Sequence, residues 1–251
     1  MLTDERHNFI RKELASKGRV LAGDLAARFS VSEDTARRDL RELAKAGDCR
    51  RVYGGAVAPA PNAGSIRVRN DLLSDEKARL ALAAVKLMRS GQSFFIDSGS
   101  TNIAIAGAIP HDVELTVATN SLGVATALAD HSLVKLIVLG GAYNRELGTC
   151  VGEETLRAIS QLNADLLFLG SCGVDAVLGA TAFDSAEAEV KRAMAKNSAA
   201  IVVAATADKL ATAAPFRVAG PEAIRHLVVD RVVQPALLSK FKRQETLIHR
   251  A

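Results

Sequence analysis

From about residue 75 onwards, short apolar runs alternate with segments that have the apolar spacing of a helix. Strands separated by helices form βαβ units, whose strands run parallel because each helical crossover returns the chain to the same edge of the sheet. This region is therefore predicted to be a Rossmann-like α/β domain built on a mostly parallel sheet. We expect strands at 93–97, 113–118, 134–139, 165–170, 199–205, 226–230 and 245–249, and helices at 75–89, 101–109, 121–130, 153–161, 185–197 and 235–242.

The first 58 residues follow a different pattern. We expect a helix from Thr3 to near Gly18, a second around 25–29, and a third that starts after the capping residue Ser32 and stops at Gly47. Residues 50–57 suit two strands that turn at a pair of glycines, so the segment is predicted to be a small winged helix-turn-helix. The stretch 59–74 is rich in turn-forming residues, which indicates domains at 1–58 and 75–251 joined by a linker at 59–74.

The third helix carries the clearest charge signal. Its apolar residues share one face, and its arginines fall on the opposite face. Residues 1–58 hold 12 Lys and Arg against 9 Asp and Glu, so they carry +3 of the net charge of +4. Arginine donates paired hydrogen bonds to guanine edges and phosphates, and this face therefore suits the major groove of DNA. A solvated face paired with nearby acids is the alternative. The residues expected to contact DNA are Ser32, Thr35, Arg37, Arg38, Arg41, Arg50 and Arg51.

Polar and glycine-rich loops follow several of the predicted strands. The run 98–102 opens a helix, where backbone N–H groups and hydroxyls can hold an anion. An ordinary strand-to-helix turn is the alternative. Because the carboxyl ends of parallel strands meet at one edge of a sheet, these loops are expected to face one crevice. The residues expected to line it are Asp97, Ser98, Gly99, Ser100, Thr101, Asn102, Thr119, Asn120, Ser121, Gly140, Gly141, Gly173 and Asp175.

Both parts of the sequence resemble one family. The segments 25–40 and 51–56 resemble the DeoR family of sugar-metabolism repressors, and the loops above, with 151–152 and 187–194, resemble its sensor domain across most of 75–249. That domain is similar to ribose 5-phosphate isomerase, most closely at 98–101. The resemblance implies a repressor of a carbohydrate-utilisation operon, controlled by a small phosphorylated sugar in the C-terminal domain, with Lys209 near the ligand. The chain departs from the family pattern at Ala36, Asp48 and Thr206.

Several polar residues have more than one interpretation. Glu187 either closes a capping box with Asp184 or binds the effector, and Lys191 is either a solvated helix residue or a ligand contact. Asp97, Asp175 or Glu187 could also serve as the general base of an isomerase. The N-terminal domain argues against that function, because a metabolic isomerase has no use for a DNA-binding module. A repressor that answers to another ligand or to a protein partner is the third possibility.

The remaining composition bears on cofactors, location and assembly. The five histidines lack metal-ligand spacing, and Cys49, Cys150 and Cys172 lie far apart and are expected to pack in the interior, so we expect no metal, cofactor or disulfide. No segment approaches the roughly 18 apolar residues of a membrane span, and the first residues lack an apolar signal core. We therefore expect a cytoplasmic protein without a membrane partner or catalytic residues. One recognition helix covers few base pairs, so operator double-stranded DNA should be bound by a dimer or larger even homo-oligomer.

Overall fold

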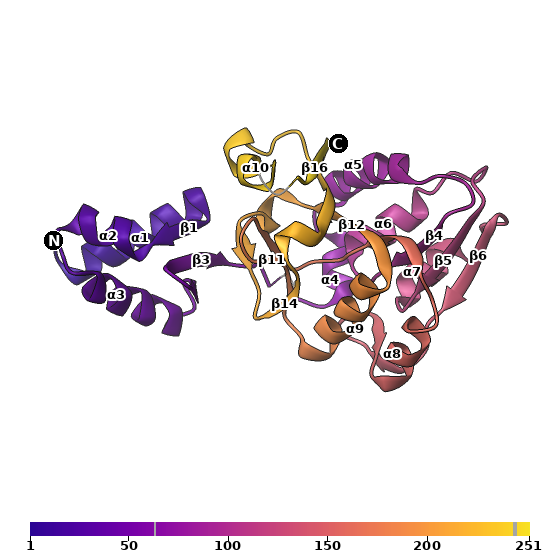
Figure 1. The fold of residues 1–251 in the computed structure, drawn as a ribbon, viewed down its shortest axis with the longest axis horizontal. Helices are drawn as coiled ribbons and strands as arrows, with labels where there is room; N and C mark the ends of the chain where they lie inside the picture. The colour runs from indigo at the N-terminus through magenta and orange to yellow at the C-terminus, as the bar shows by residue number, and fades with distance from the viewer. Residues whose placement is uncertain (63, 243–244) are drawn as a thin grey trace.

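The computed structural model describes residues 1–62, 64–242 and 245–251. A small domain of helices lies at one end of the molecule, and a larger α/β domain lies at the other, with strand β3 (Gly55–Pro59) leading from the first toward the second (Figure 1). Residue 63 of the expected linker and residues 243 and 244 of the expected sensor domain lie outside the described residues.

The N-terminal domain has the predicted helices and wing. Its elements are α1 (Thr3–Lys17), β1 (Arg19–Leu21), α2 (Ala22–Phe29), α3 (Glu33–Lys45), β2 (Arg50–Val52) and β3. β1 and β2 both pair antiparallel with β3, which makes β3 the central strand of the wing. Ile10, Leu25 and Leu40 belong to one buried cluster that joins the three helices. Ala36 also lies in this cluster and is fully buried, so the small side chain at this position fits the close packing of α3.

A buried ion pair ties the third helix to the first. Asp39 is 1% exposed, and its two carboxylate oxygens accept hydrogen bonds from Arg6 Nε at 2.6 Å and Arg6 Nη2 at 2.9 Å. This two-point contact raises the pKa of Arg6. Asp39 is therefore an anchor of α3 rather than part of its solvated face. Asp48 makes a second, more exposed pair with Arg11 of α1, at 2.8 Å.

The C-terminal domain contains all seven predicted strands in one sheet. Their order is β16-β15-β12-β9-β4-β5-β6, and each neighbouring pair is parallel. The strands are β4 (Ser93–Ile96), β5 (Leu115–Thr119), β6 (Val134–Val138), β9 (Ala164–Phe168), β12 (Ser198–Ala205), β15 (Ile224–Val229) and β16 (Leu247–Arg250). The helices are α5 (Ser74–Ala84), α6 (Ser100–Gly107), α7 (Leu122–Leu128), α8 (Glu153–Ile159), α9 (Ser185–Lys196) and α10 (Pro235–Lys242). The helix predicted at 75–89 stops at Ala84 and continues as a single 3-10 turn, Val85–Leu87.

Helices cover both faces of this sheet. Successive side chains of a strand point to opposite faces, so Phe94 and Ile96 of β4 pack in one buried cluster with α5, α6 and α7. Phe95 packs in the other cluster, with α8, α9 and α10. The central strands β4, β9 and β12 read as apolar runs because they are buried on both faces, whereas the edge strands β6 and β16 are partly exposed. The sheet therefore has solvent access mainly at its ends, where the loops lie.

Several short elements lack a sequence signal. They comprise the linker helix α4 (Ile66–Asp71), the hairpin β7 (Ala142–Asn144) and β8 (Thr149–Val151), the small strands β10 (Gly173–Asp175), β11 (Gly179–Ala182), β13 (Thr212–Ala213) and β14 (Phe216–Ala219), and the 3-10 turns η2 (Ala207–Lys209) and η3 (Pro221–Ala223). Strands of two to four residues rich in Gly, Ala and Thr have no readable apolar alternation. One of them joins the two domains, because β13 pairs parallel with β3, at Thr212 with Ala58 and at Ala213 with Pro59.

We expect Asp39→Ala to destabilise the N-terminal domain by about 2 kcal/mol, because Arg6 would lose its carboxylate partner. The expected loss lies between those of surface and fully buried pairs, since Arg6 keeps its hydrogen bonds to the Met1 carbonyl and the Thr3 hydroxyl. Hydrogen-exchange mass spectrometry of the α3 amides measures the change. Glu42→Ala, an exposed acid on the same helix, is the control and should stay within about 0.5 kcal/mol. Equal amide protection in the two variants would show that the Arg6 contact does not hold the helix.

Candidate functional site

The predicted DNA-contacting residues lie on α3 and on the wing. Ser32 caps α3, because its hydroxyl accepts a hydrogen bond from the backbone N–H of Thr35 at 3.2 Å, and the two hydroxyls are 3.0 Å apart. The α2–α3 turn passes through Ser30, whose φ of 54° is left-handed. The cap was predicted from the sequence, and it fixes where the exposed helix begins.

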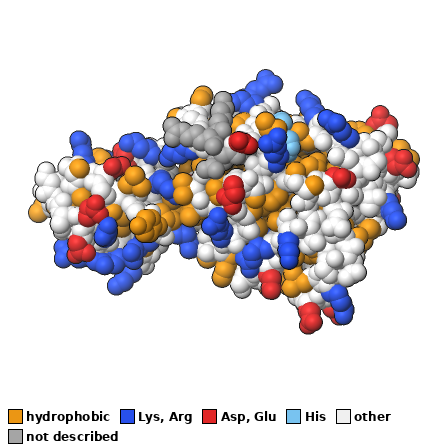
Figure 2. Space-filling view, in the orientation of Figure 1, with side chains coloured by type: hydrophobic (Ala, Val, Ile, Leu, Met, Phe, Trp, Pro, Cys, Tyr) orange, Lys and Arg blue, Asp and Glu red, His pale blue; other side chains and the backbone are white. Residues whose placement is uncertain are grey.

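The arginines of α3 and β2 differ in their partners. Arg37 is paired with Glu33 at 2.6 Å, on the same face of the helix. Arg38 and Arg41 are exposed and make no ion pair within the described part of the chain, while Arg50 is half-buried and Arg51 exposed. Figure 2 shows Lys and Arg side chains gathered along the edge of the N-terminal domain where α3 lies. Arg38 and Arg41 can therefore reach a nucleic acid without first breaking an ion pair of the described chain, whereas Arg37 would have to leave Glu33.

A pocket lies at the carboxyl edge of the central strands. It is formed by the loop 98–102 after β4, the loop 170–172 after β9, two side chains of α9, Arg69 of α4 and Lys209 of η2. Gly99 has φ of 129°, a conformation that side chains rarely adopt, so glycine is needed where the chain turns into α6. Asn102 is structural, since its amide donates to the carbonyls of Asp97 at 3.0 Å and Phe168 at 2.8 Å.

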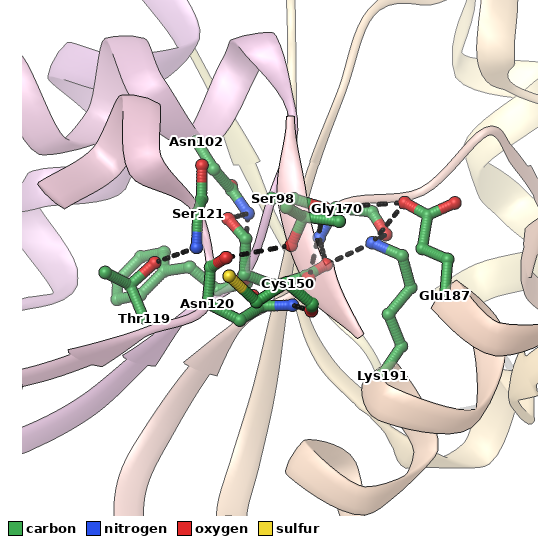
Figure 3. Close-up of polar contacts among 12 residues, drawn as sticks. Ser98, Asn102, Thr119, Asn120, Ser121, Cys150, Gly170, Glu187 and Lys191 are labelled. Carbon is green, nitrogen blue, oxygen red and sulfur yellow. Dashed lines mark hydrogen bonds and ion pairs between the residues drawn. The ribbon is translucent and has the colours of Figure 1, made fainter. Parts of the chain in front are cut away.

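Lys191 is the buried cation beneath this pocket. Its ammonium donates to Asp97 and to the carbonyl of Gly170 at 2.9 Å, and it lies 3.2 Å from Glu187 (Figure 3). Burial acts to lower the pKa of Lys191, but Asp97 and Glu187 outweigh it and raise the pKa above its ordinary value. Three acceptors match the three N–H donors of an ammonium group. Lys191 is therefore not a solvated helix residue, and it holds β4, β9 and α9 together; a contact with a ligand stays a prediction.

The cap of α9 is made by Asp184, while the side chain of Glu187 lies at the pocket, and its contact with an effector stays a prediction. The backbone N–H of Glu187 donates to the capping carboxylate of Asp184 at 2.8 Å, whereas its own side chain turns into the pocket. There it lies near Lys191 and accepts from Ser98 Oγ at 3.4 Å. Asp184 caps α9, and Glu187 shapes the pocket floor.

Two other cations face the pocket without a carboxylate partner among the described residues. Burial lowers the pKa of Lys209; Cys172 and Asp208 oppose this shift, while Arg69 and Lys191 add to it. Arg69 Nε is buried and has no hydrogen-bond partner in the described structure. The pocket thus keeps positive charge that its own residues do not neutralise.

Two hydroxyls of the same pocket are also without partners. Thr101 is 6% exposed, and its Oγ1 accepts and donates no hydrogen bond among the described residues. Ser171 Oγ is also buried and without a hydrogen-bond partner among the described residues. Buried polar atoms are normally hydrogen-bonded, so two such groups beside unpaired cations indicate a site that is completed by a polar anionic ligand.

The other predicted effector residues lie outside this pocket. Asn120 donates to the carbonyl of Cys150 at 2.9 Å, Ser121 caps α7, and the carbonyl of Gly140 accepts from Thr155 at 2.6 Å. Figure 3 shows Thr119, Asn120 and Ser121 as a separate group beside the 98–102 loop. Asp175 pairs with Arg19 of the N-terminal domain at 2.9 Å. The structure does not bring Thr119, Asn120, Ser121, Gly140, Gly141, Gly173 or Asp175 into the lining of the pocket, and Asp97 is fully buried beneath it.

Sequence reasoning did not select Arg69, and from the loop after β9 it chose Gly173 and Asp175 rather than residues 170–172, which line the pocket. Arg69 lies in the stretch interpreted as linker, and only the helix α4 shows that it turns toward the sensor domain. Cys49 and Cys150 are buried as expected, but Cys172 is half-buried and lines the pocket, so its interpretation as a packing residue is wrong. Burial raises the pKa of the Cys172 thiol.

Two family models match the two parts of the chain. The model for the DeoR-like helix-turn-helix domain matches residues 6–62, and the model for the DeoR C-terminal sensor domain matches residues 73–231. The glycerol-3-phosphate regulon repressor of Escherichia coli (strain K12) is 35% identical over 199 residues, which cover 79% of each chain. A putative aga operon transcriptional repressor of Escherichia coli O157:H7 is 30% identical over 245 residues, 96% of this chain and 91% of the relative.

Among solved structures, ribose 5-phosphate isomerase A from Methanocaldococcus jannaschii aligns over 54% of each chain, with 15% identity and a TM-score of 0.41. No helix in the described ranges is long and apolar enough to cross a membrane. The winged helix-turn-helix and the attached pocket domain define a DNA-binding regulator with a sensor. The chain belongs to the DeoR family, whose matched members are transcriptional repressors and not enzymes.

We expect Lys191→Met to lower the free energy of unfolding by about 3–5 kcal/mol, because two buried carboxylates would lose their cation. For a domain of this size that corresponds to a fall of roughly 10 °C in the melting temperature, measured by calorimetry. Lys196→Met, an exposed lysine on the same helix, is the control. The double variant Lys191→Met with Asp97→Asn should recover part of the loss. Equal melting temperatures for the Lys191 and Lys196 variants would contradict the structural role.

Proposed function

We propose that this chain represses a carbohydrate-utilisation operon, and that a small phosphorylated sugar in the pocket controls its binding to the operator. The observation that carries the proposal is the unneutralised pair Arg69 and Lys209 facing the 98–101 loop. A phosphate dianion would pair with both cations and accept hydrogen bonds from Thr101 Oγ1 and the N–H groups at the start of α6. The names of relatives support the same class, since three of the matched proteins are repressors of glycerol-3-phosphate regulons.

The space around the pocket favours a ligand of a few carbons. A compartment of about 100 Å³ adjoins it, shares Arg69 and Lys209, and is walled by Pro61, Leu147 and Phe183. Sites for larger organic ligands usually reach roughly 300–1,000 Å³. We infer that the cationic end holds the phosphate and that the adjoining compartment holds the carbon chain.

The N-terminal domain is proposed to read the operator through α3. Arg38 and Arg41 are exposed and unpaired within the described chain, which suits contacts with base edges. Arg50 and Arg51 on the wing suit contacts with phosphates. One such helix covers a single half-site, so we propose that a dimer or larger even homo-oligomer binds repeated half-sites.

Replacing Arg37, Arg38 and Arg41 by Ala should weaken operator binding by about 1–3 kcal/mol for each lost base contact. Arg51→Ala should weaken operator and random DNA alike, and should reduce the salt dependence by about one phosphate contact. Fluorescence anisotropy at several salt concentrations measures both effects. Arg157→Ala, an exposed arginine of α8, controls for net charge. Unchanged operator affinity in the triple variant would exclude α3 as the reading helix.

Thr101→Val tests the role of the Thr101 hydroxyl while keeping the volume of the side chain. Valine has nearly the same shape and removes a hydroxyl that lacks a partner, so stability should be unchanged or slightly higher. Affinity for a sugar phosphate should fall by about tenfold or more, because a hydrogen bond to a charged group is lost. Calorimetric titration with glycerol 3-phosphate measures this. Thr246→Val removes a similarly unpaired buried hydroxyl outside the pocket and should leave binding intact. Equal affinities in the two variants would remove Thr101 from the site.

A further inference from the structure

We propose that the ion pair Arg19–Asp175 and the pairing of β3 with β13 transmit the state of the pocket to the DNA-reading domain. The inference rests on the proposed function of the pocket as an anion sensor. It assigns a role to Asp175, which the structure places away from the pocket although the sequence suggested a ligand contact. It also explains why a sensor strand of two residues pairs with the wing.

The first connection starts at Lys209. This residue ends the turn η2 and faces the pocket, and only Leu210 and Ala211 separate it from β13. β13 pairs directly with β3 at Ala58 and Pro59, and the carbonyl of Ala213 accepts from the backbone N–H of Ala60 at 3.1 Å. A shift of Lys209 toward an anion therefore acts on the central strand of the wing through three residues of chain.

The second connection starts at Cys172. This residue lines the pocket and is followed at once by β10, which ends at Asp175. Asp175 Oδ1 accepts from Arg19 at 2.9 Å and from the backbone N–H groups of Val177 and Leu178 at 2.9 and 3.0 Å. The carboxylate is thus fixed on the sensor side, and Arg19 sits on β1, opposite Val57 of β3. Both connections end on the same strand of the wing.

The two connections are locked together by close packing. The backbone N–H of Ala211 donates to the carbonyl of Val174 at 2.8 Å. A Cβ on Gly173 would lie 2.7 Å from the carbonyl oxygen of Thr212, and one on Gly18 would lie 2.3 Å from Cβ of Ala211. No atom can be added at these contacts without displacing backbone. Segments packed this tightly move as a unit, which is the property that coupling between two sites requires.

The ion pair between Arg19 and Asp175 determines which edge of the wing contacts the sensor domain. Arg19 and Asp175 are 14% and 7% exposed, so salt and water screen them less than they screen surface pairs. The opposite edge of β3 pairs with β2, which carries Arg50 and Arg51. The wing is therefore held on one side by the sensor domain and presents its basic residues on the other. A change in the position of the Asp175 carboxylate would therefore change the positions of Arg50 and Arg51 relative to α3.

A double-mutant cycle on the full chain tests the coupling without any ligand. Lys209→Met removes a charge that a bound anion would neutralise, so it should change affinity for an in vitro selected duplex by about fivefold or more. In an Asp175→Asn background the same change should fall to about half its wild-type size or less, because the variant weakens the Arg19 contact and leaves only the β13–β3 connection at full strength. Asp48→Asn disrupts a comparable Arg–Asp pair inside the N-terminal domain and should leave the Lys209 effect intact.

Two results of this cycle would overturn the proposal. One is an equal effect of Lys209→Met in the Asp175→Asn and wild-type backgrounds. The other is a change below about twofold in the wild-type background, which would mean that the pocket charge is not felt by the DNA-binding domain. Melting curves of Asp175→Asn establish that the variant is folded before the comparison is made.

A second experiment separates this inference from the proposed effector class. Glycerol 3-phosphate and inorganic phosphate are titrated by calorimetry without DNA and then added to the operator complex. Asp175→Asn should bind the probe with a Kd within about twofold of wild type but show a smaller shift in operator affinity, because one of the two connections is weakened. A shift retained at wild-type size would refute the coupling role. If neither probe binds the wild-type chain, the effector class is wrong, and the cycle above still decides the coupling.

Discussion

The structure depends on one constraint, the common direction of its seven parallel strands. A parallel sheet needs a crossover between neighbouring strands, and helices on both faces cover its apolar residues. All carboxyl ends then fall on one edge, which is where the loops after β4 and β9 meet. Lys191 reaches this edge from α9 and joins Asp97 to Gly170. The pocket thus exists because strand direction places the loops together and one buried ammonium holds them there.

Charge balance divides this edge into two parts. Lys191 is surrounded by hydrogen-bond acceptors, two of which are carboxylates, and it stabilises the folded state. Lys209 and Arg69 keep positive charge at a buried surface, and Thr101 keeps a hydroxyl without a partner in the described structure. A protein selected only for stability would pair or remove such groups. Their presence beside the start of α6 is the physical basis for assigning an anionic effector, because binding would supply the missing partners.

The attachment of the two domains follows from a single strand. β3 is the centre of the wing, yet it extends far enough to pair with β13 of the sensor domain, while Arg19 beside it contacts Asp175. A flexible linker alone would leave the DNA-binding domain independent of the ligand. Instead, the pairing of β3 with β13 and the largely buried ion pair between Arg19 and Asp175 connect the sensor domain directly to the wing. The helix α4 adds to this arrangement, since the linker itself contributes Arg69 to the pocket.

The sequence by itself determined the features that depend on near neighbours. Apolar period defined the seven strands and most helices, the Ser32 cap and Gly47 bounded α3, and the position of 98–102 between strand and helix marked the anion loop. The tertiary structure alone decided which polar residues meet. Asp175 and Asn120 follow strands just as Ser98 does, yet one pairs with Arg19 and the other with Cys150. The role of Lys191 became clear only from its contact with Asp97, which lies 94 positions away in the sequence. Such partners are set by packing over long separations, which leaves no periodic trace in the local sequence.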